Sequence, residues 1–414
     1  MTTLRGKSAV DRAGLWSGLA LGLGQFALMG TSLILSLSLA YAGGLAAVGA
    51  IASAVLVFQL TCGVLQRTLA EATLFAQSHA DATADLLTCR RAVGTALLGG
   101  GAGAVVALLA GLAIPGARLG LVLAYVVGIP FAIALDIGRS AGVAAGAARG
   151  AFVETAAWLA VQVGAVLTCA AFRSPMGVCL SWTVTNVLFV ALAATAPHRR
   201  PSVSGLLGWT RARAGSMGPA SVDALLNGLA PLLAIQAAAL VTTAATLGEI
   251  RVFQQVFAPL VFVSITLRRM LVYRRSPDTP VRPGQDLRDG LVATALMAAG
   301  AVVIGLAVLA GHALVPALGF IPVGLVLVAA GLEKAALGLS FGCSLGMFVR
   351  GRWRALLRTR YVMIVATLIA VPPLTAWWGA SGFLVGSAAG MVVYSVMLVA
   401  QAVPPSDEAA RVPS

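Results

Sequence analysis

Long apolar runs limit the fold of this chain more than any other feature of its sequence. A helix that crosses a membrane needs about 20 consecutive apolar residues, and the first run, from Leu15 to Ala40, already exceeds that length. The apolar core of a cleaved signal peptide is only about 7–15 residues long, so we interpret this run as a retained helix. We predict twelve transmembrane helices, at residues 15–41, 45–65, 92–114, 119–138, 155–172, 177–195, 219–242, 247–267, 290–312, 318–347, 361–378 and 380–402.

Composition places the chain among polytopic membrane proteins. Only 10% of its 414 residues are charged, whereas soluble proteins have about 25% charged residues. The connections between the apolar runs are too short to build a soluble domain. The sequence contains no Walker, H-E-x-x-H, C-x-x-C or G-x-S-x-G motif. We therefore expect no enzymatic activity and no cofactor.

The positive charges follow the connections between helices. The net charge of +14 would suggest nucleic acid in a soluble protein, but here the even-numbered connections and both termini hold nearly all the cations. Cytoplasmic loops of membrane proteins carry such an excess of Lys and Arg. We predict that both termini are cytoplasmic, that nucleic acid is not a partner, and that anionic lipids contact the basic loops. The opposite side carries only Arg118, Arg173 and Arg251.

A weak internal repeat divides the chain. When the run at 45–65 is placed over the run at 247–267 at an offset of 199 residues, which is close to half the chain, Gly49 meets Gly248, and each run ends in Arg. Six helices per half give both halves the same membrane orientation, which is a parallel repeat. We predict an all-α polytopic fold of two parallel six-helix lobes, with an N-terminal lobe at 1–200, a cytoplasmic inter-lobe loop at 201–218, a C-terminal lobe at 219–403 and a cytoplasmic tail at 404–414.

Polar side chains interrupt the apolar run at 247–267. Arg251, Gln254 and Gln255 share a face by helical spacing, and Pro259 frees the carbonyl of Gln255 and so kinks the helix. Two interpretations fit this pattern. The face borders a wet cavity, or Arg251 lies at the membrane edge and the glutamines bond neighbouring helices.

The preceding predicted helix has the same pattern of polar residues followed by a proline. Asp223, Asn227 and Pro231 are four residues apart and share a face, and Pro231 frees the carbonyl of Asn227. This face also suits a polar cavity. Alternatively, Asp223 lies in the first turn of its helix, where the helix dipole favours an acid.

Charged residues also fall inside two other predicted helices. Glu333 and Lys334 lie near the middle of the run at 318–347, where an isolated charge costs about 2.5–3.5 kcal/mol. Adjacent residues point about 100° apart on a helix, so these two need not pair with each other, and each either lines the interior or pairs with another helix. Asp136, near the end of the run at 119–138, is expected to pair with Arg139.

Two stretches have distinctive patterns. "LGEIRVFQQVFAPLVFVSITLRRMLV" (247–272) contains an outer turn, G-x-x-R, a Gln-rich turn, a Pro and a basic end. "ALDIGRSAGVAAGAARGAFVETAAWL" (134–159) contains a polar residue, an Arg and a loop of small residues that returns the chain. In these stretches the chain resembles helix 8 and the turn from helix 4 to helix 5 of the multidrug/oligosaccharidyl-lipid/polysaccharide (MOP) exporter superfamily, and its Wzx-type polysaccharide flippases above all. The architecture covers 15–403.

The resemblance implies a MATE-like transporter of the bacterial cytoplasmic membrane whose lobes alternate access. It implies a lipid-linked sugar as cargo and polysaccharide biosynthesis proteins as neighbours. Arg251, Gln254 and Gln255 would contact the cargo, with Lys334 as a second cation. Relatives that flip the peptidoglycan precursor use several arginines on helix 1, whereas this chain has no cation there after Arg12, which argues against that cargo.

Two other functions stay open. An exporter of drugs or metabolites with the same fold would couple transport to H⁺ or Na⁺, and related exporters often carry an acid in the first lobe. Asp136 is the only acid within the predicted helices of that lobe. A membrane polymerase or ligase would need a sizeable outer loop, and this sequence has none.

Overall fold

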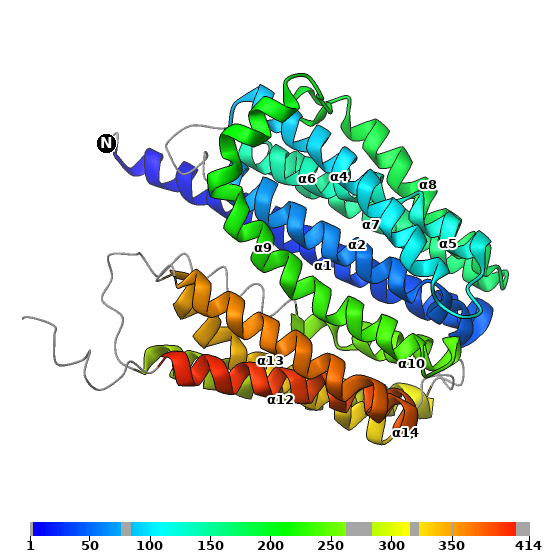
Figure 1. The fold of residues 1–414 in the computed structure, drawn as a ribbon. Coiled ribbons are helices and arrows are strands. Elements are labelled where there is room, and N and C mark those ends of the chain that lie inside the picture. Colours follow the sequence, from blue (N-terminus) through cyan, green and yellow to red (C-terminus); the bar gives the residue numbers. More distant parts are fainter. Residues whose placement is uncertain (1–2, 76–83, 262–283, 315–322, 350–351, 403–414) are drawn as a thin grey trace, which may run out of the picture. The chain divides into compact units, whose positions relative to one another are not determined.

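The computed structural model describes residues 3–75, 84–261, 284–314, 323–349 and 352–402, and nearly all of this part is helical, with no strand in it (Figure 1). Ten of its helical stretches are long and apolar enough to cross a membrane. The prediction of an all-helical polytopic membrane protein is therefore confirmed. The exact number of twelve helices stays a prediction, since part of the run at 247–267 lies outside the described residues.

The chain separates into two compact units. The first consists of Met1–Leu232 with Thr243–Arg251, and the second of Leu233–Thr242 with Val252–Ser414. The first unit carries the predicted N-terminal lobe together with parts of the two helices that follow it. The predicted lobe boundary at 201–218 stays a prediction.

Helices of the first unit run up and down in sequence order. Its elements are α1 (Thr3–Ala50), α2 (Ala52–Leu65), the π-helical segment η1 (Gln66–Phe75), α4 (Leu86–Leu112), α5 (Leu119–Val126), α6 (Ile129–Ala144), α7 (Ala148–Ala171), α8 (Pro175–Ala193), the 3₁₀ turn η2 (Pro197–Arg199) and the first part of α9 (Leu206–Ala239). α10 (Ala244–Val256) begins in this unit and continues into the second. The second unit adds α12 (Gln285–Leu314), α13 (Leu325–Val349) and α14 (Trp353–Ala402).

Two glycines separate helices that otherwise run on continuously. Gly44 (φ 75°) interrupts α1, and Gly379 (φ 58°) interrupts α14. Both φ values fall in the region that costs glycine little and other residues more. The interruptions coincide with the connections predicted between residues 41 and 45 and between 378 and 380. α14 thus contains the last two predicted helices.

The two ends of the first unit differ in charge. At one end the backbone N–H of Ala84 donates to Ala144 (3.0 Å) and that of Ser202 to Arg90 (3.0 Å), which gathers the loops rich in Arg. We call this the basic end. At the other end Arg173 donates to the carbonyl of Tyr41 (2.6 Å). This segregation agrees with the alternation of charge in the sequence, although the cytoplasmic placement of the basic end stays a prediction.

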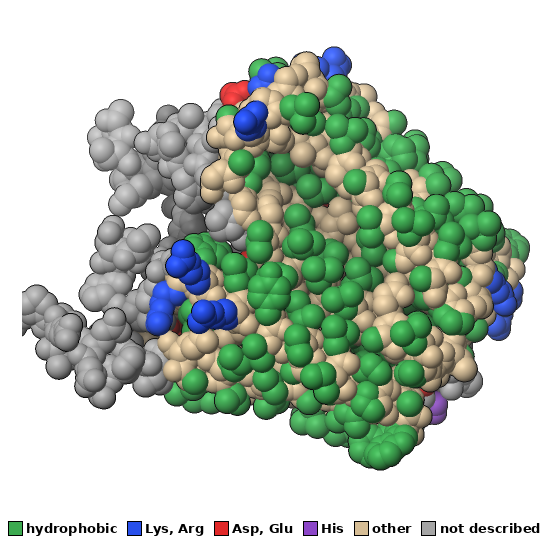
Figure 2. All heavy atoms as spheres, in the orientation of Figure 1, with side chains coloured by type: hydrophobic (Ala, Val, Ile, Leu, Met, Phe, Trp, Pro, Cys, Tyr) green, Lys and Arg blue, Asp and Glu red, His purple; other side chains and the backbone are tan. Residues whose placement is uncertain are grey.

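Apolar side chains are spread over the visible surface in Figure 2. Val302, Val303 and Leu306 of α12, for example, are each more than half exposed. Such a surface suits lipid, because lipid tails solvate apolar side chains. Inside the first unit, Phe58, Tyr125 and Trp182 pack as an aromatic cluster, with Tyr125 stacked on Trp182 at 4.4 Å between ring centroids.

Candidate functional site

The segment η1 carries two polar side chains from the end of α2 into the interior of the first unit. Its wider helical turn is seen in Thr73, whose Oγ1 donates to the carbonyl of Thr68, five residues back (2.9 Å). Stretches of π-helix are rare and are often found at functional sites. Gln66 and Arg67, the first two residues of η1, each contact a carboxylate on a different helix.

Arg67 forms an ion pair with Asp223 of α9. The Asp223 side chain is 1% exposed and that of Arg67 is 21% exposed. α9 begins at Leu206, more than four turns before Asp223. The alternative that Asp223 is a first-turn acid stabilised by the helix dipole is therefore wrong, because that effect is confined to the end turns of a helix.

Gln66 reaches the second carboxylate. Its Nε2 donates to Asp136 Oδ2 of α6 at 2.6 Å, and the Cys62 thiol lies 3.9 Å from the same oxygen. Asp136 is buried. Gln66 and Arg67 thus connect the end of α2 with an acid on α6 and an acid on α9 at once.

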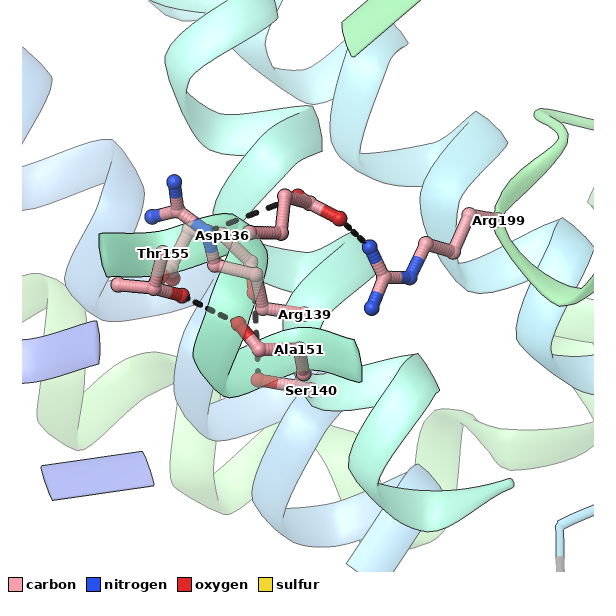
Figure 3. Close-up of polar contacts among 7 residues, drawn as sticks. Asp136, Arg139, Ser140, Ala151, Thr155 and Arg199 are labelled. Carbon is pink, nitrogen blue, oxygen red and sulfur yellow. Dashed lines mark hydrogen bonds and ion pairs between the residues drawn. The ribbon is translucent and has the colours of Figure 1, made fainter. Parts of the chain in front are cut away.

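The cation near Asp136 has a different partner from the one expected. The ion pair of Arg139 is formed with Glu154 of α7, with 4.0 Å between Arg139 Nε and Glu154 Oε1 (Figure 3). Arg139 also lies over the Trp158 ring, 4.4 Å from its centroid. Glu154 pairs in addition with Arg199 of η2. Asp136 interacts electrostatically with Arg139, as expected, but the ion pair within 4.0 Å is formed with Glu154, which two arginines share.

The other residues predicted to bind cargo are dispersed. Arg251 and Gln255 of α10 are both buried, and Gln254 is half-buried. Asp223 is buried whereas Asn227, four residues later, is exposed. Their assignment to a cargo cavity stays a prediction.

The two prolines predicted to kink their helices lie in different surroundings. α9 stays helical through Pro231. α10 ends at Val256, and the chain becomes helical again at residue 258, around Pro259. Leu260 N–H then donates to the carbonyl of Phe257 (3.1 Å). The helix is therefore interrupted close to Pro259.

Glu333 and Lys334 of α13 are buried in the second unit, and they pair with each other. Lys334 Nζ donates to Glu333 Oε2 at 3.0 Å, and Ser387 of α14 donates to Glu333 Oε1 at 2.9 Å. Glu333 and Lys334 were expected to line the interior or to pair with other helices, whereas they pair with each other. The two long side chains span the 100° between their positions, and pairing offsets part of the cost of burying two charges.

Several residues of this network were missed by the sequence argument. Arg67 and Arg199 count as loop cations in the sequence, and Gln66 and Glu154 carry no motif. A polar pair directly after an apolar run, as at 66–67, is the only local signal. Among the described residues, no group of three or more His, Cys, Asp or Glu side chains is placed to hold a metal ion.

Comparison with known proteins gives a likeness of structure only. No protein-family profile matches the chain, and no curated protein matches it significantly. A Vibrio cholerae MATE transporter, VcmN in the bent form, is 15% identical and aligns over 96% of this chain and 97% of its own length, with a TM-score of 0.50.

Two further solved structures match over most of their length. The lipid II flippase MurJ in an inward closed conformation is 8% identical, with 94% of this chain and 87% of that chain covered and a TM-score of 0.64. A MOP superfamily transporter from Pyrococcus furiosus is 12% identical, with 94% of each chain covered and a TM-score of 0.57. The chain is therefore a multi-pass membrane protein with the fold of the MOP superfamily transporters.

Proposed function

We propose that the chain is a transporter that flips a lipid-linked oligosaccharide or polysaccharide unit across the bacterial cytoplasmic membrane by alternating access. Both termini and the basic end of the first unit would face the cytoplasm, where anionic lipids and polysaccharide biosynthesis proteins are the expected partners. No cofactor is required, and transport does not involve covalent chemistry on the cargo.

The ion pair between Arg67 and Asp223 carries this proposal. It joins the end of α2 to α9, and these two segments belong to different halves of the internal repeat. A partly buried pair between two helices has two discrete arrangements, formed and broken. A contact of this kind suits a transporter that opens and closes its basic end.

The cargo is proposed from the chemistry of the side chains that are predicted to contact it. A lipid-linked sugar carries phosphate, which the planar fork of Arg binds with two hydrogen bonds, and Gln side chains both donate to and accept from hydroxyls. Arg251 with Gln254 and Gln255 supplies this combination. Lys334 is the second candidate, and it is paired with Glu333. The likeness to a lipid II flippase supports a lipid-linked cargo.

An ion-coupled exporter of drugs or metabolites is the alternative. Asp136 and Glu333 are buried carboxylates within membrane helices, and such acids are common in proton and ion relays. The likeness to structures described as multidrug MATE transporters supports this alternative.

Purified protein in vesicles can test the two cargo classes side by side. A fluorescent lipid-linked oligosaccharide placed in both leaflets becomes fully accessible to a membrane-impermeant quencher only if it is flipped. Parallel vesicles loaded with a cationic dye and given a pH or Na⁺ gradient report export. Flipping of the lipid without export of the dye supports the proposed flippase. Export of the dye without flipping would contradict that proposal and support the ion-coupled exporter.

A further inference from the structure

Buried hydrogen-bond donors outnumber acceptors around Glu154. Within the described part of the chain, Arg139 Nε, Arg139 Nη2, Arg199 Nε and Trp158 Nε1 are buried and have no hydrogen-bond partner. Glu154 Oε1 is the one acceptor of this group in the same condition. Buried polar groups in proteins are nearly always hydrogen-bonded, so four donors beside one acceptor call for a species rich in acceptor atoms.

These groups form one cluster. Glu154 lies between the two guanidinium groups and is paired with both. Trp158 lies one turn further along the same face of α7, under Arg139. A Cβ added to Gly142 would come within 2.7 Å of Arg199 Nη2, so glycine at that position makes room for the Arg199 side chain. The fold is shaped to keep both arginines inside.

Two acids balance the charge of the two arginines. The Arg139 and Arg199 side chains are only 7% and 5% exposed, and Glu154 lies between them. Asp136, one turn earlier on α6, interacts electrostatically with Arg139 and accepts a hydrogen bond from Gln66. The case for a ligand therefore rests on the buried donors that have no hydrogen-bond partner among the described residues.

We propose that Arg139, Arg199, Glu154 and Trp158 form an oxyanion site that binds a phosphate group. Phosphate presents several acceptor oxygens, and bidentate bonds from Arg to phosphate are among the strongest hydrogen bonds in proteins. A metal ion would be repelled by the two guanidinium groups, and it would offer no acceptor atom to the buried donors. The site is independent of the proposed transport of a lipid-linked sugar.

The phosphate has two possible sources at this place. Arg199 belongs to the short turn η2, Arg200 beside it is exposed, and the Glu154 side chain keeps 17% exposure. The site therefore lies near the surface of the basic end, within reach of free phosphate in solution and of the phosphate of a lipid headgroup.

The test measures how phosphate and an anionic lipid change the thermal stability of the protein. Full-length protein is placed in nanodiscs of phosphatidylcholine, and the melting temperature is recorded in sodium phosphate and in sodium chloride of equal ionic strength. Nanodiscs containing phosphatidylglycerol are measured in chloride. A rise with phosphate identifies a free oxyanion, and a rise only with phosphatidylglycerol identifies a headgroup. No rise in either condition overturns the proposal.

Substitutions then place the binding at this cluster. Arg139→Gln and Arg199→Gln should weaken the apparent affinity about tenfold, the equivalent of one charged hydrogen bond. Arg149→Gln, an exposed cation at the start of α7, is the matched control and should leave it unchanged. An equal phosphate or lipid effect in wild type and in both cluster variants would refute the site.

Glu154→Gln gives a result of opposite sign, and it covers the case in which the arginine variants do not fold. Removing the competing carboxylate should tighten binding about tenfold, and phosphorus NMR line broadening reads this out directly. A purely structural Glu154 would lower stability and leave the affinity unchanged or lower, which would contradict the proposal.

Discussion

Arg67 of η1 and Asp223 of α9 form a partly buried ion pair across 156 positions of sequence. Arg67 counts as one of the loop cations that set membrane orientation, yet its side chain points to an acid on another helix. The adjacent Gln66 holds Asp136 of α6. Because both contacts start from one segment, any movement of η1 affects two buried carboxylates.

Arg67→Gln should destabilise the protein more than Asp223→Asn does. The first change removes the cation from a carboxylate that is 1% exposed, and breaking a buried pair from one side costs about 3–5 kcal/mol. The second leaves a cation that is 21% exposed and partly hydrated. Thermal unfolding in detergent measures the difference. The double variant should recover most of the loss, and additive losses would show that the two residues do not interact.

Gly49 and Gly248, which the internal repeat aligns, contact each other. A Cβ on Gly49 would lie 1.7 Å from the carbonyl oxygen of Ala244, and one on Gly248 would lie 1.8 Å from that of Leu45. Gly49→Ala and Gly248→Ala should each cost about 1–3 kcal/mol through overpacking, measured as a lowered melting temperature.

Gly63→Ala is the matched control for that experiment. No heavy atom lies within 4 Å of a Cβ placed there, so alanine should raise stability by about 0.5–1 kcal/mol, as it does inside other helices. Similar losses of stability for the alanine variants of Gly49 and Gly63 would mean that the close backbone contact at Gly49 does not contribute to stability.

Helix positions could be predicted from the sequence because lipid imposes a simple rule on them. Apolar runs long enough to cross the membrane must satisfy their backbone groups internally, which means helix. The interruptions at Gly44 and Gly379 fell where polar or small residues separate the runs. Glu333 and Lys334 were correctly expected to be buried.

The polar network could not be predicted because its partners are distant in sequence. Nothing local indicates that Arg199, in a short connection, turns inward to Glu154, or that Asp136 is reached by Gln66. The start of α9 was also misjudged, since the helix extends well before its apolar part. Which side chains pair across helices depends on how the helices pack, and packing cannot be read from a short stretch of sequence.

Asp85 should contribute a pH-dependent cap to α4. Its carboxylate accepts from Thr88 N–H at 2.9 Å. Burial acts to raise the pKa of Asp85, but hydrogen bonds from Thr88 and Leu87 and the charge of Arg213 outweigh it and lower the pKa below its ordinary value. The cap is therefore fully stabilising above the unfolded pKa, near 3.9, and is lost as pH falls through the lower folded value.

Hydrogen exchange at the first turn of α4 measures this cap. Asp85→Ala should speed exchange there by the equivalent of about 1 kcal/mol at neutral pH, and Asp85→Asn should speed it much less. Wild type should approach the alanine variant only in strong acid. Equal exchange in wild type and Asp85→Ala at pH 7 would rule out the cap.

Lys334→Met should lower the stability of the protein far more than the double substitution Glu333→Gln with Lys334→Met. The single change leaves the Glu333 carboxylate, bonded to Ser387, buried without its cation, at a cost of about 3–5 kcal/mol. Neutralising both members is often tolerated. Membrane insertion and melting temperature check stability. A double variant as unstable as the single one would show that the pair itself is indispensable.

The flipping assay with Arg251 variants tests the central claim most directly. The measured quantity is the rate at which a labelled lipid-linked oligosaccharide becomes accessible to an impermeant quencher in vesicles. We expect Arg251→Ala to abolish flipping in protein that remains folded, and Arg251→Lys to restore part of it, because Lys keeps the charge without the planar fork. Flipping by Arg251→Ala at the wild-type rate would contradict the account and leave Arg251 as a residue of structural importance only.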